Sequence, residues 1–182
     1  RANLWALRSL GVNEVVAINA VGGINPAVRM GRLVIPDQLI DYTWGREHTI
    51  DDGSSGELQH IDFTEPYDRE LRLALIDAAA GNDIPHEASG VQAVMQGPRL
   101  ETAAEIQRLE RDGSDGVGMT GMPEASLARE LGLAYASVCM VVNPAAGLGD
   151  VPISLEMMRE VLQREAAVVG NLLAGLLAER YA

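Results

Sequence analysis

The stretch from Asp115 to Gly147 constrains the fold most strongly, because it contains a complete strand–helix–strand unit. Its pattern predicts a short apolar strand over Val117–Met119, a tight polar turn, a helix that starts at Pro123, and a long buried strand over Leu133–Val142. Two parallel strands need a crossover connection, which is usually a helix. The unit therefore predicts an α/β fold built on a largely parallel sheet.

Polar side chains stand where the apolar strands end. Thr120 follows the first strand of the unit, and Asn143 follows the second. Glu101 follows another predicted strand, over Val91–Met95. Ligands of parallel α/β sheets bind beyond the carboxyl ends of the strands, so these three residues are candidates for a ligand site. Two of them also have a simpler explanation, since Thr120 can cap a helix and a helix N-terminus alone stabilises a carboxylate such as Glu101.

The composition fits one globular domain with a sizeable core, because 47% of the 182 residues are hydrophobic and 22% are charged. The formal net charge of −12 argues against nucleic acid as a partner, although a few backbone N–H groups can still hold a small anion. Cys139 is the only cysteine, so an intrachain disulfide is excluded and a cytoplasmic location is expected.

Neither a membrane span nor a signal peptide is predicted. The most apolar segment, Ala166–Ala178, has roughly half the length that a bilayer requires, and Gly170 and Asn171 interrupt it. The chain begins with Arg1 rather than Met, and its first ten residues already have the pattern of a helix that ends at Gly11. We therefore expect residues 1–182 to be a single domain that lacks its N-terminal portion.

The rest of the chain alternates strands with helices, which predicts a three-layer α/β/α architecture. Strands are expected over Glu14–Asn19, ending in a Gly22–Gly23 turn, and over Leu33–Asp41, where Pro36 indicates an edge or a bulge. Helices are expected over Pro66–Ala80, from a Thr102–Glu105 capping box to Asp112, and from Ser154 to about Tyr181.

A long polar loop is expected over residues 42–64, and such loops in compact domains are usually functional or disordered. His48 and His60 lie in it, and each on its own is more typical of a surface residue than of a catalyst. The spacing between these histidines and Cys139 matches no set of metal ligands, so no metal site is predicted.

Five stretches in the same order resemble the purine nucleoside phosphorylase and methylthioadenosine phosphorylase family. They are RANLWAL (1–7), NAVGGINP (19–26), GRLVIPDQLIDYT (31–43), QGPRLETAAEI (96–106) and VGMTGMPEASLARELGLAYA (117–136). Within the family, the likeness is strongest to bacterial members that act on the 6-oxopurine nucleoside 5′-methylthioinosine. The resemblance implies a nucleoside phosphorylase-like fold with a central mixed, largely parallel sheet, a homotrimer, and phosphate as co-substrate without any cofactor.

The resemblance also assigns roles to individual positions. Phosphate would be held by Asn19, by the backbone N–H of Ala20 and by the hydroxyl of Thr120. The nucleoside would contact further positions, with Met119 under the ribose and Val21, Gly22 and Ala145 near the purine. Leu155 and Met158 would form an apolar pocket for a 5′-methylthio group, and His60 would be lent to the site of a neighbouring subunit.

Asn143 and Glu101 would read the base and carry the catalysis. The Asn143 amide can donate to purine O6 and hold a protonated N7, and the Glu101 carboxylate can accept from N1–H. Adenine presents the opposite pattern, and adenine-specific relatives carry Asp at the positions of Asn143 and Ala145. The sequence therefore favours a 6-oxopurine, since an unpaired buried donor or acceptor costs about 1–3 kcal/mol.

Two alternatives stay open at this point. Inosine and guanosine are the next substrates to consider, although relatives that take them typically place a histidine near the 5′-hydroxyl, and this chain has none after His86. The chain could also be a truncated, non-catalytic purine-binding subunit, because the family's phosphate loop and its Arg-His segment would precede Arg1. Two departures from the family are Gln92, where Tyr is common, and Gly121, where Ser or Thr is common.

Overall fold

The computed structural model describes residues 1–54, 60–150 and 152–181, which contain five helices and one seven-stranded sheet. The helices are α1 (Ala2–Ser9), α2 (Arg69–Gly81), α3 (Ala103–Arg111), α4 (Glu124–Glu130) and α5 (Leu155–Tyr181). The strands are β1 (Glu14–Gly23), β2 (Leu33–Val34), β3 (Gln38–Asp41), β4 (His86–Glu87), β5 (Val91–Val94), β6 (Gly116–Gly118) and β7 (Ala134–Pro144).

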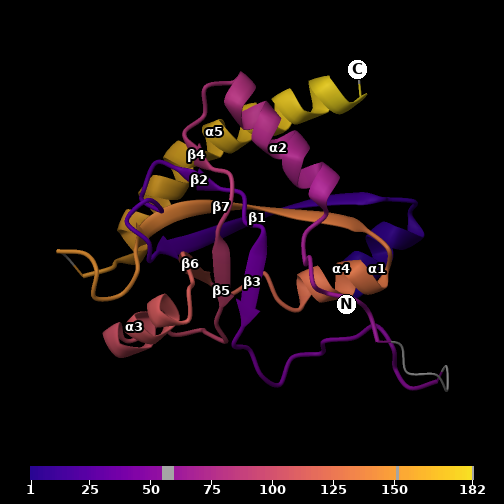
Figure 1. The fold of residues 1–182 in the computed structure, drawn as a ribbon, viewed down its shortest axis with the longest axis horizontal. Helices are drawn as coiled ribbons and strands as arrows, with labels where there is room; N and C mark the ends of the chain where they lie inside the picture. Colours follow the sequence, from indigo (N-terminus) through magenta and orange to yellow (C-terminus); the bar gives the residue numbers. More distant parts are fainter. Residues whose placement is uncertain (55–59, 151, 182) are drawn as a thin grey trace.

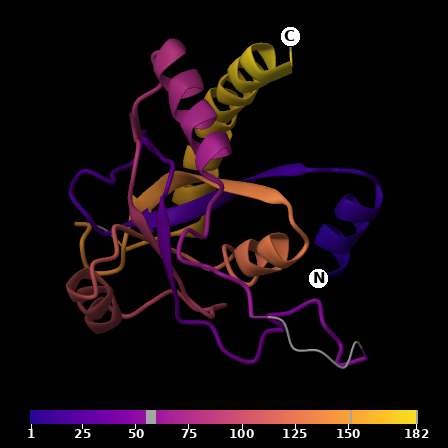
Figure 2. The ribbon, with the colours of Figure 1, turned by 45° about the vertical axis from the view of Figure 1, so that its right-hand side comes forward.

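The sheet is mixed but mostly parallel, and helices cover both of its faces (Figures 1 and 2). Its strand order is β3-β5-β6-β1-β7-β2-β4, with antiparallel pairing only for β1 with β6 and for β2 with β7 among the described strands. In Figure 1, α2 and α5 lie together above β1 and β7, and α1 and α4 lie below them. The predicted three-layer α/β/α fold is confirmed.

The two longest strands, β1 and β7, form the centre of the sheet. They pair in parallel from Glu14 opposite Ala134 to Gly23 opposite Pro144. On one side, Val138 belongs to a buried cluster with residues of α2 and α5, and on the other side Tyr135 belongs to a cluster with residues of α1 and α4. The alternation of a strand thus supplies apolar side chains to both layers of the core.

Two strand predictions need correction. β1 does not break after Asn19 but continues to Gly23, because Gly22 and Gly23 pair with both β7 and β6. The segment Leu33–Asp41 forms two strands instead of one, and these occupy distant places in the sheet: β2 lies beside β7, and β3 lies at the far edge. The interruption contains Pro36, which cannot donate a ladder hydrogen bond.

The predicted helix starts are confirmed for α3 and α5. At α3 the backbone N–H of Glu105 donates to Thr102 Oγ1 (3.1 Å), and the backbone N–H of Thr102 donates to Glu105 Oε2 (2.7 Å). At α5 the backbone N–H of Met157 donates to Ser154 Oγ (3.1 Å). Two of the orphan N–H groups at the start of α3 are therefore satisfied by the capping box.

Helix α5 also corrects the prediction about membrane spans. Over Leu155–Arg180 it is long and apolar enough, by length and composition, to cross a membrane. In this fold, however, its buried residues Val161, Val169, Leu172 and Leu176 belong to the core cluster that α5 shares with α2 and β7. The apolar character of α5 is thus explained in part by packing.

The α2–α5 layer gives a test of the core. Leu75 is completely buried on α2, whereas Leu73 on the same helix is 47% exposed. We expect Leu75→Ala to lower the free energy of unfolding by about 2–5 kcal/mol, because it removes transfer energy and leaves a cavity. Leu73→Ala should change it by less than about 0.5 kcal/mol. Urea denaturation measures both, and equal effects would contradict the placement of α2.

Candidate active site

A cavity of about 260 Å³ lies where β1, β7 and the end of β6 meet the segment before α5. Most of the residues predicted for the site line it, namely Ala20, Val21, Gly22, Glu101, Met119, Thr120, Asn143, Ala145 and Met158. Asn19, Leu155 and His60 do not line it. The fold thus brings segments that are far apart in the sequence to one hollow.

A β-bulge directs Asn143 toward the cavity. Val21 lies opposite Val141, but Gly22 lies opposite Asn143, so Val142 is an extra residue in β7. Asn143 is only 5% exposed, and its Nδ2 donates to its neighbour's carbonyl, Pro144 O (2.6 Å). A Cβ at Gly22 would lie 3.2 Å from Asn143 Nδ2, which is tighter than ordinary contacts. Glycine at position 22 therefore leaves room for the amide.

Thr120 is oriented by a chain of buried polar groups. Its Oγ1 donates to Asn19 Oδ1 (2.7 Å), and Asn19 Nδ2 donates to Ser137 Oγ (2.6 Å). Asn19 is 4% exposed, so its amide lies behind the cavity wall and fixes the Thr120 hydroxyl.

Thr120 and Asn143 line the same cavity, but not because both follow the carboxyl ends of parallel strands, as the sequence predicted. β6 runs antiparallel to β1 and pairs with it only at Gly22 and Gly23, so the end of β6 is not at the carboxyl edge of β1. Thr120 instead lies beside the middle of β1, close to Asn19.

Glu101 enters the cavity from the connection between β5 and α3. Burial raises the pKa of its carboxyl above the usual value, and the nearby negative charge of Glu105 acts in the same direction. Its own backbone N–H and the guanidinium of Arg99 partly oppose this shift. Glu105 behaves differently, because a hydrogen bond from Arg99 lowers its pKa to about 2. Two neighbouring carboxylates thus have pKa values displaced in opposite directions.

Several apolar side chains line the cavity. Met158 of α5, Ile153, Leu100 and Ile18 contribute to its wall. Leu155, which was predicted for this wall, is 68% exposed and lies outside it. Ile153 takes its place. It precedes the capping residue Ser154, so a prediction based on the periodicity of the helix could not include it.

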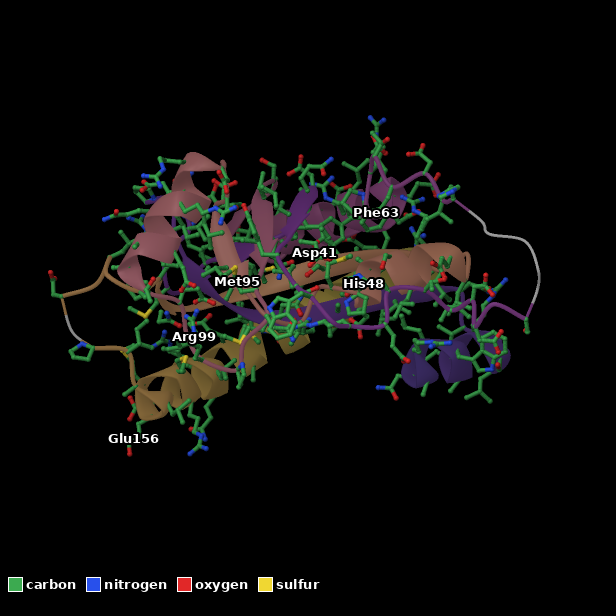
Figure 3. All side chains as sticks on the ribbon, turned by 90° about the horizontal axis from the view of Figure 1, so that it is seen from below. Asp41, His48, Phe63, Met95, Arg99 and Glu156 are labelled. Carbon is green, nitrogen blue, oxygen red and sulfur yellow. The ribbon has the colours of Figure 1, made fainter. Side chains whose placement is uncertain are left out.

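A second cavity, of about 210 Å³, shares Glu101 with the first. It is lined by Tyr42, Trp44, Met95, Gln96, Gly97, Arg99, Glu101 and Glu105. In the view from below, Asp41, His48 and Met95 lie in the middle of the molecule, with Arg99 toward α3 and α5 (Figure 3). The loop after β3, through Tyr42 and Trp44, therefore runs beside the candidate site.

A resident metal ion has no candidate ligands in the described part of the chain, since no three His, Cys, Asp or Glu residues come together there in a suitable group.

His60 is exposed and does not line the cavity of its own chain.

The sequence profile of the phosphorylase superfamily matches residues 1–178. The chain belongs to the phosphorylase superfamily. It is 49% identical over 178 residues to a probable S-methyl-5′-thioinosine phosphorylase of Pseudomonas syringae pv. tomato, a match that covers 98% of this chain and 72% of that protein. It is 43% identical over 178 residues to the 6-oxopurine nucleoside phosphorylase of Pyrococcus furiosus, covering 95% of this chain and 67% of the relative.

Solved structures of the superfamily share the same fold. Methylthioadenosine phosphorylase from Schistosoma mansoni in complex with adenine superimposes with a TM-score of 0.91 at 30% identity, over 97% of this chain and 68% of that chain. The resemblance predicted from five sequence stretches is therefore confirmed, and a small purine nucleoside and phosphate are the class of substrates that the superfamily implies.

The raised pKa of Glu101 gives a prediction about pH. The carboxyl should take up a proton at a higher pH than an ordinary glutamate, and protonation removes the charged acceptor for a purine N1–H. We expect hypoxanthine affinity, measured by calorimetry, to fall as the pH is lowered through that pKa. Glu101→Gln should abolish this acid limb. Glu105→Gln, which keeps the capping box, should retain it. An acid limb that survives in Glu101→Gln would exclude Glu101 as its source.

Proposed function

We propose that this protein catalyses the phosphorolysis of a 6-oxopurine nucleoside, with 5′-methylthioinosine and phosphate giving hypoxanthine and 5-methylthioribose 1-phosphate. The observation that carries the proposal is that Asn143, Glu101, Thr120 and Met119 all line one cavity. The purine would lie between Asn143 and Glu101, the ribose against Met119, and the phosphate beside Thr120. Such a reaction returns a purine base to salvage.

The base end of the cavity suits a 6-oxopurine. An amide at position 143 can donate to O6, and as the glycosidic bond breaks it can stabilise the purine with its proton on N7. The partly buried carboxylate of Glu101 accepts from N1–H. Ala145 is 2% exposed, and its side chain has no acceptor for the exocyclic amino group of adenine. These features support hypoxanthine over adenine as the leaving base.

The phosphate end relies on oriented hydrogen-bond donors. Thr120 and Ala20 line the same wall. The Thr120 hydroxyl has one proton, which it donates to Asn19 Oδ1 in this structure, so binding phosphate would require that proton to turn from Asn19 to a phosphate oxygen. A phosphate placed there would face the sugar carbon as oxocarbenium character develops, which is where negative charge stabilises the transition state. Phosphate acts as the co-substrate, and the reaction requires no other cofactor.

The apolar side chains of the cavity favour a 5′-methylthio group. Ile153 and Met158 contribute side chains without hydrogen-bond donors or acceptors of ordinary strength to the cavity wall. A 5′-hydroxyl buried there would lose its hydrogen bonds to water, which costs about 1–3 kcal/mol. Inosine and guanosine are therefore the second-ranked substrates.

Assembly into a homotrimer would complete the site. His60 is exposed and lies outside the cavity of its own chain, which supports a role in the site of a neighbouring subunit. The single domain would act in the cytoplasm, consistent with a buried free thiol at Cys139.

One observation favours a second candidate function, a purine-binding subunit without catalysis. The described cavity wall contains no Arg, Lys or His, so the phosphate would meet only neutral donors there. This alternative predicts hypoxanthine binding with no turnover, even for the product of the complete reading frame.

The base-reading assignment can be tested by Asn143→Asp. A carboxylate can accept from the adenine amino group but cannot donate to O6 of a 6-oxopurine. We expect the ratio of kcat/KM for methylthioinosine to that for methylthioadenosine to fall by roughly one to two orders of magnitude. Asn171→Asp, at an exposed position on α5, is the matched control and should leave the ratio unchanged. An unchanged ratio in Asn143→Asp would refute the assignment.

The reaction type is tested by omitting phosphate. Hypoxanthine release, followed by a coupled oxidation assay on the product of the complete reading frame, should require phosphate and yield a sugar 1-phosphate. Release that continues undiminished without phosphate would identify a nucleoside hydrolase instead.

A further inference from the structure

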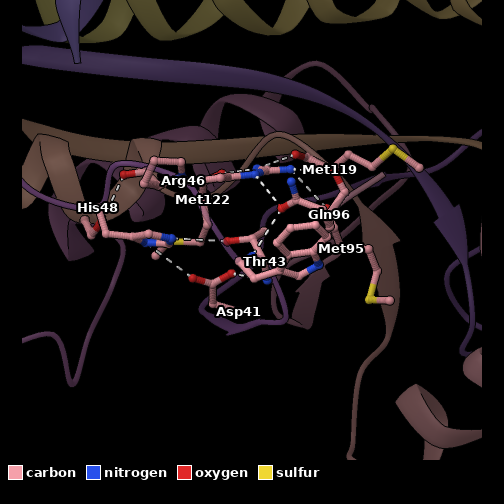
Figure 4. A network of polar contacts seen from close by, with 11 residues as sticks. Asp41, Thr43, Arg46, His48, Met95, Gln96, Met119 and Met122 are labelled. Atoms are coloured by element: carbon pink, nitrogen blue, oxygen red, sulfur yellow. Dashed lines mark hydrogen bonds and ion pairs between the residues drawn. The ribbon is translucent and has the colours of Figure 1, made fainter. Parts of the chain in front are cut away.

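One guanidinium group ties together the two loops that carry the candidate site residues. Arg46 lies in the loop after β3, and its Nη1 donates to the backbone carbonyls of Met119 (2.9 Å) and Met122. Its Nη2 donates to Gln96 O (2.9 Å) and Met95 O (3.3 Å), and its Nε donates to Gln96 Oε1 (3.1 Å). Figure 4 shows these contacts.

The acceptors belong to two separate arms of the site. Residues 95–96 follow β5 and lead to Glu101, which lines the cavity and would face the purine. Residues 119–122 follow β6 and include Met119 and Thr120, which line the cavity and would face the sugar and the phosphate. Because the guanidinium is planar and rigid, it fixes the spacing between its acceptors, which a flexible ammonium group cannot do.

The two arms are also packed directly against each other. A Cβ at Gly97 would overlap Met119 Sδ, and Gly97 has a φ of +62°, so only glycine fits the contact. A small change in the position of one arm is therefore transmitted to the other. Arg46 donates to Met119 O and to Gln96 O, the carbonyls beside this Gly97–Met119 contact.

The loop that presents Arg46 is itself folded by local hydrogen bonds. Asp41 Oδ1 accepts from the backbone N–H of Thr43 (2.8 Å), and Thr43 Oγ1 lies 3.3 Å from His48 Nε2. The backbone N–H of Trp44 donates to Gln96 Oε1 (3.2 Å), the same oxygen that accepts from Arg46. All the acceptors of Arg46 in the described residues are neutral oxygens, so its role here is to fix geometry rather than to pair with a carboxylate.

We propose that Arg46 is a positioning residue of the phosphorolysis reaction: it sets the distance between the arm that holds the purine and the arm that holds the ribose and phosphate. The inference rests on the proposed function. Arg46 is not among the residues that line either cavity beside Glu101. Its effect passes through the carbonyls of Met119 and Gln96, and it concerns alignment of the reactants more than their binding.

A matched control exists elsewhere in the fold. Arg72 on α2 is half-buried like Arg46 and also donates to backbone carbonyls, those of Pro36 (2.8 Å), Ala88 (2.7 Å) and Ile35 (3.4 Å). None of these residues lines the candidate cavity. Substitution of Arg72 therefore measures what the loss of such a cluster costs in stability alone.

The experiment compares Arg46→Lys with Arg72→Lys in the product of the complete reading frame. We expect Arg46→Lys to lower kcat for methylthioinosine phosphorolysis by about 10- to 100-fold, because a misplacement of about 1 Å has an effect of this size, while the hypoxanthine dissociation constant changes far less. Arg72→Lys should leave kcat unchanged at a temperature where circular dichroism shows it folded. Methylguanidinium should restore part of the kcat of Arg46→Ala and none in Arg72→Ala.

The outcomes separate the two proposals. If the wild type releases hypoxanthine only with phosphate but folded Arg46→Lys keeps a kcat within twofold of the wild type, or Arg72→Lys loses as much, the positioning role is overturned. If the wild type shows no phosphorolysis, the proposed function fails, and with it the inference.

Discussion

The parallel pairing of β1 with β7 is the interaction on which the rest of the structure depends. It is the longest ladder of the sheet, and its side chains enter the core clusters of both helical layers. A single irregularity in it, the extra residue Val142, has a large consequence. The bulge turns Asn143 toward the cavity while Gly22, on the other strand, leaves the space that the amide needs. Stability and chemistry thus share one pair of strands.

Everything else at the site is brought to this pair by longer connections. Thr120 follows β6, a strand that pairs antiparallel with β1 at Gly22 and Gly23, and its hydroxyl donates to Asn19 of β1. Glu101 lies in the connection between β5 and α3. The two arms follow β5 and β6, which pair as neighbours in the sheet, and the backbone N–H of Met95 donates to Gly118 O (2.8 Å) where that pairing ends. The carbonyl contacts of Arg46 supply a direct link between them.

The sequence predicted the features that depend on local patterns. The α/β layering, the capping box at Thr102 and the candidate residues Thr120 and Asn143 were all found in this way, although Asn143 lies within β7 and not after it. What it missed depends on distant partners. Gly22 and Gly23 look like a turn, but strands on both sides extend β1 through them. Arg46 donates to backbone carbonyls at least 49 residues away in the chain. Because every residue has a backbone carbonyl, a sequence pattern does not mark which ones Arg46 will contact.

The site itself was predictable to the extent that motifs mark it. The resemblance to a known family selected most of the residues that line the cavity, whereas Leu155 was placed there in error and Ile153 was overlooked. The mistake arises at the start of α5, where helical periodicity begins but the wall of the cavity is formed by the residue before the cap.

The central claim is that one cavity holds the purine between Asn143 and Glu101 with phosphate at Thr120. A crystal structure of the protein with hypoxanthine and phosphate tests it most directly. The account predicts that O6 accepts from the Asn143 amide, that N1–H donates to the Glu101 carboxylate, and that phosphate lies against Thr120. A purine bound with its six-membered ring away from both residues, or in the neighbouring cavity beside Trp44, would contradict it.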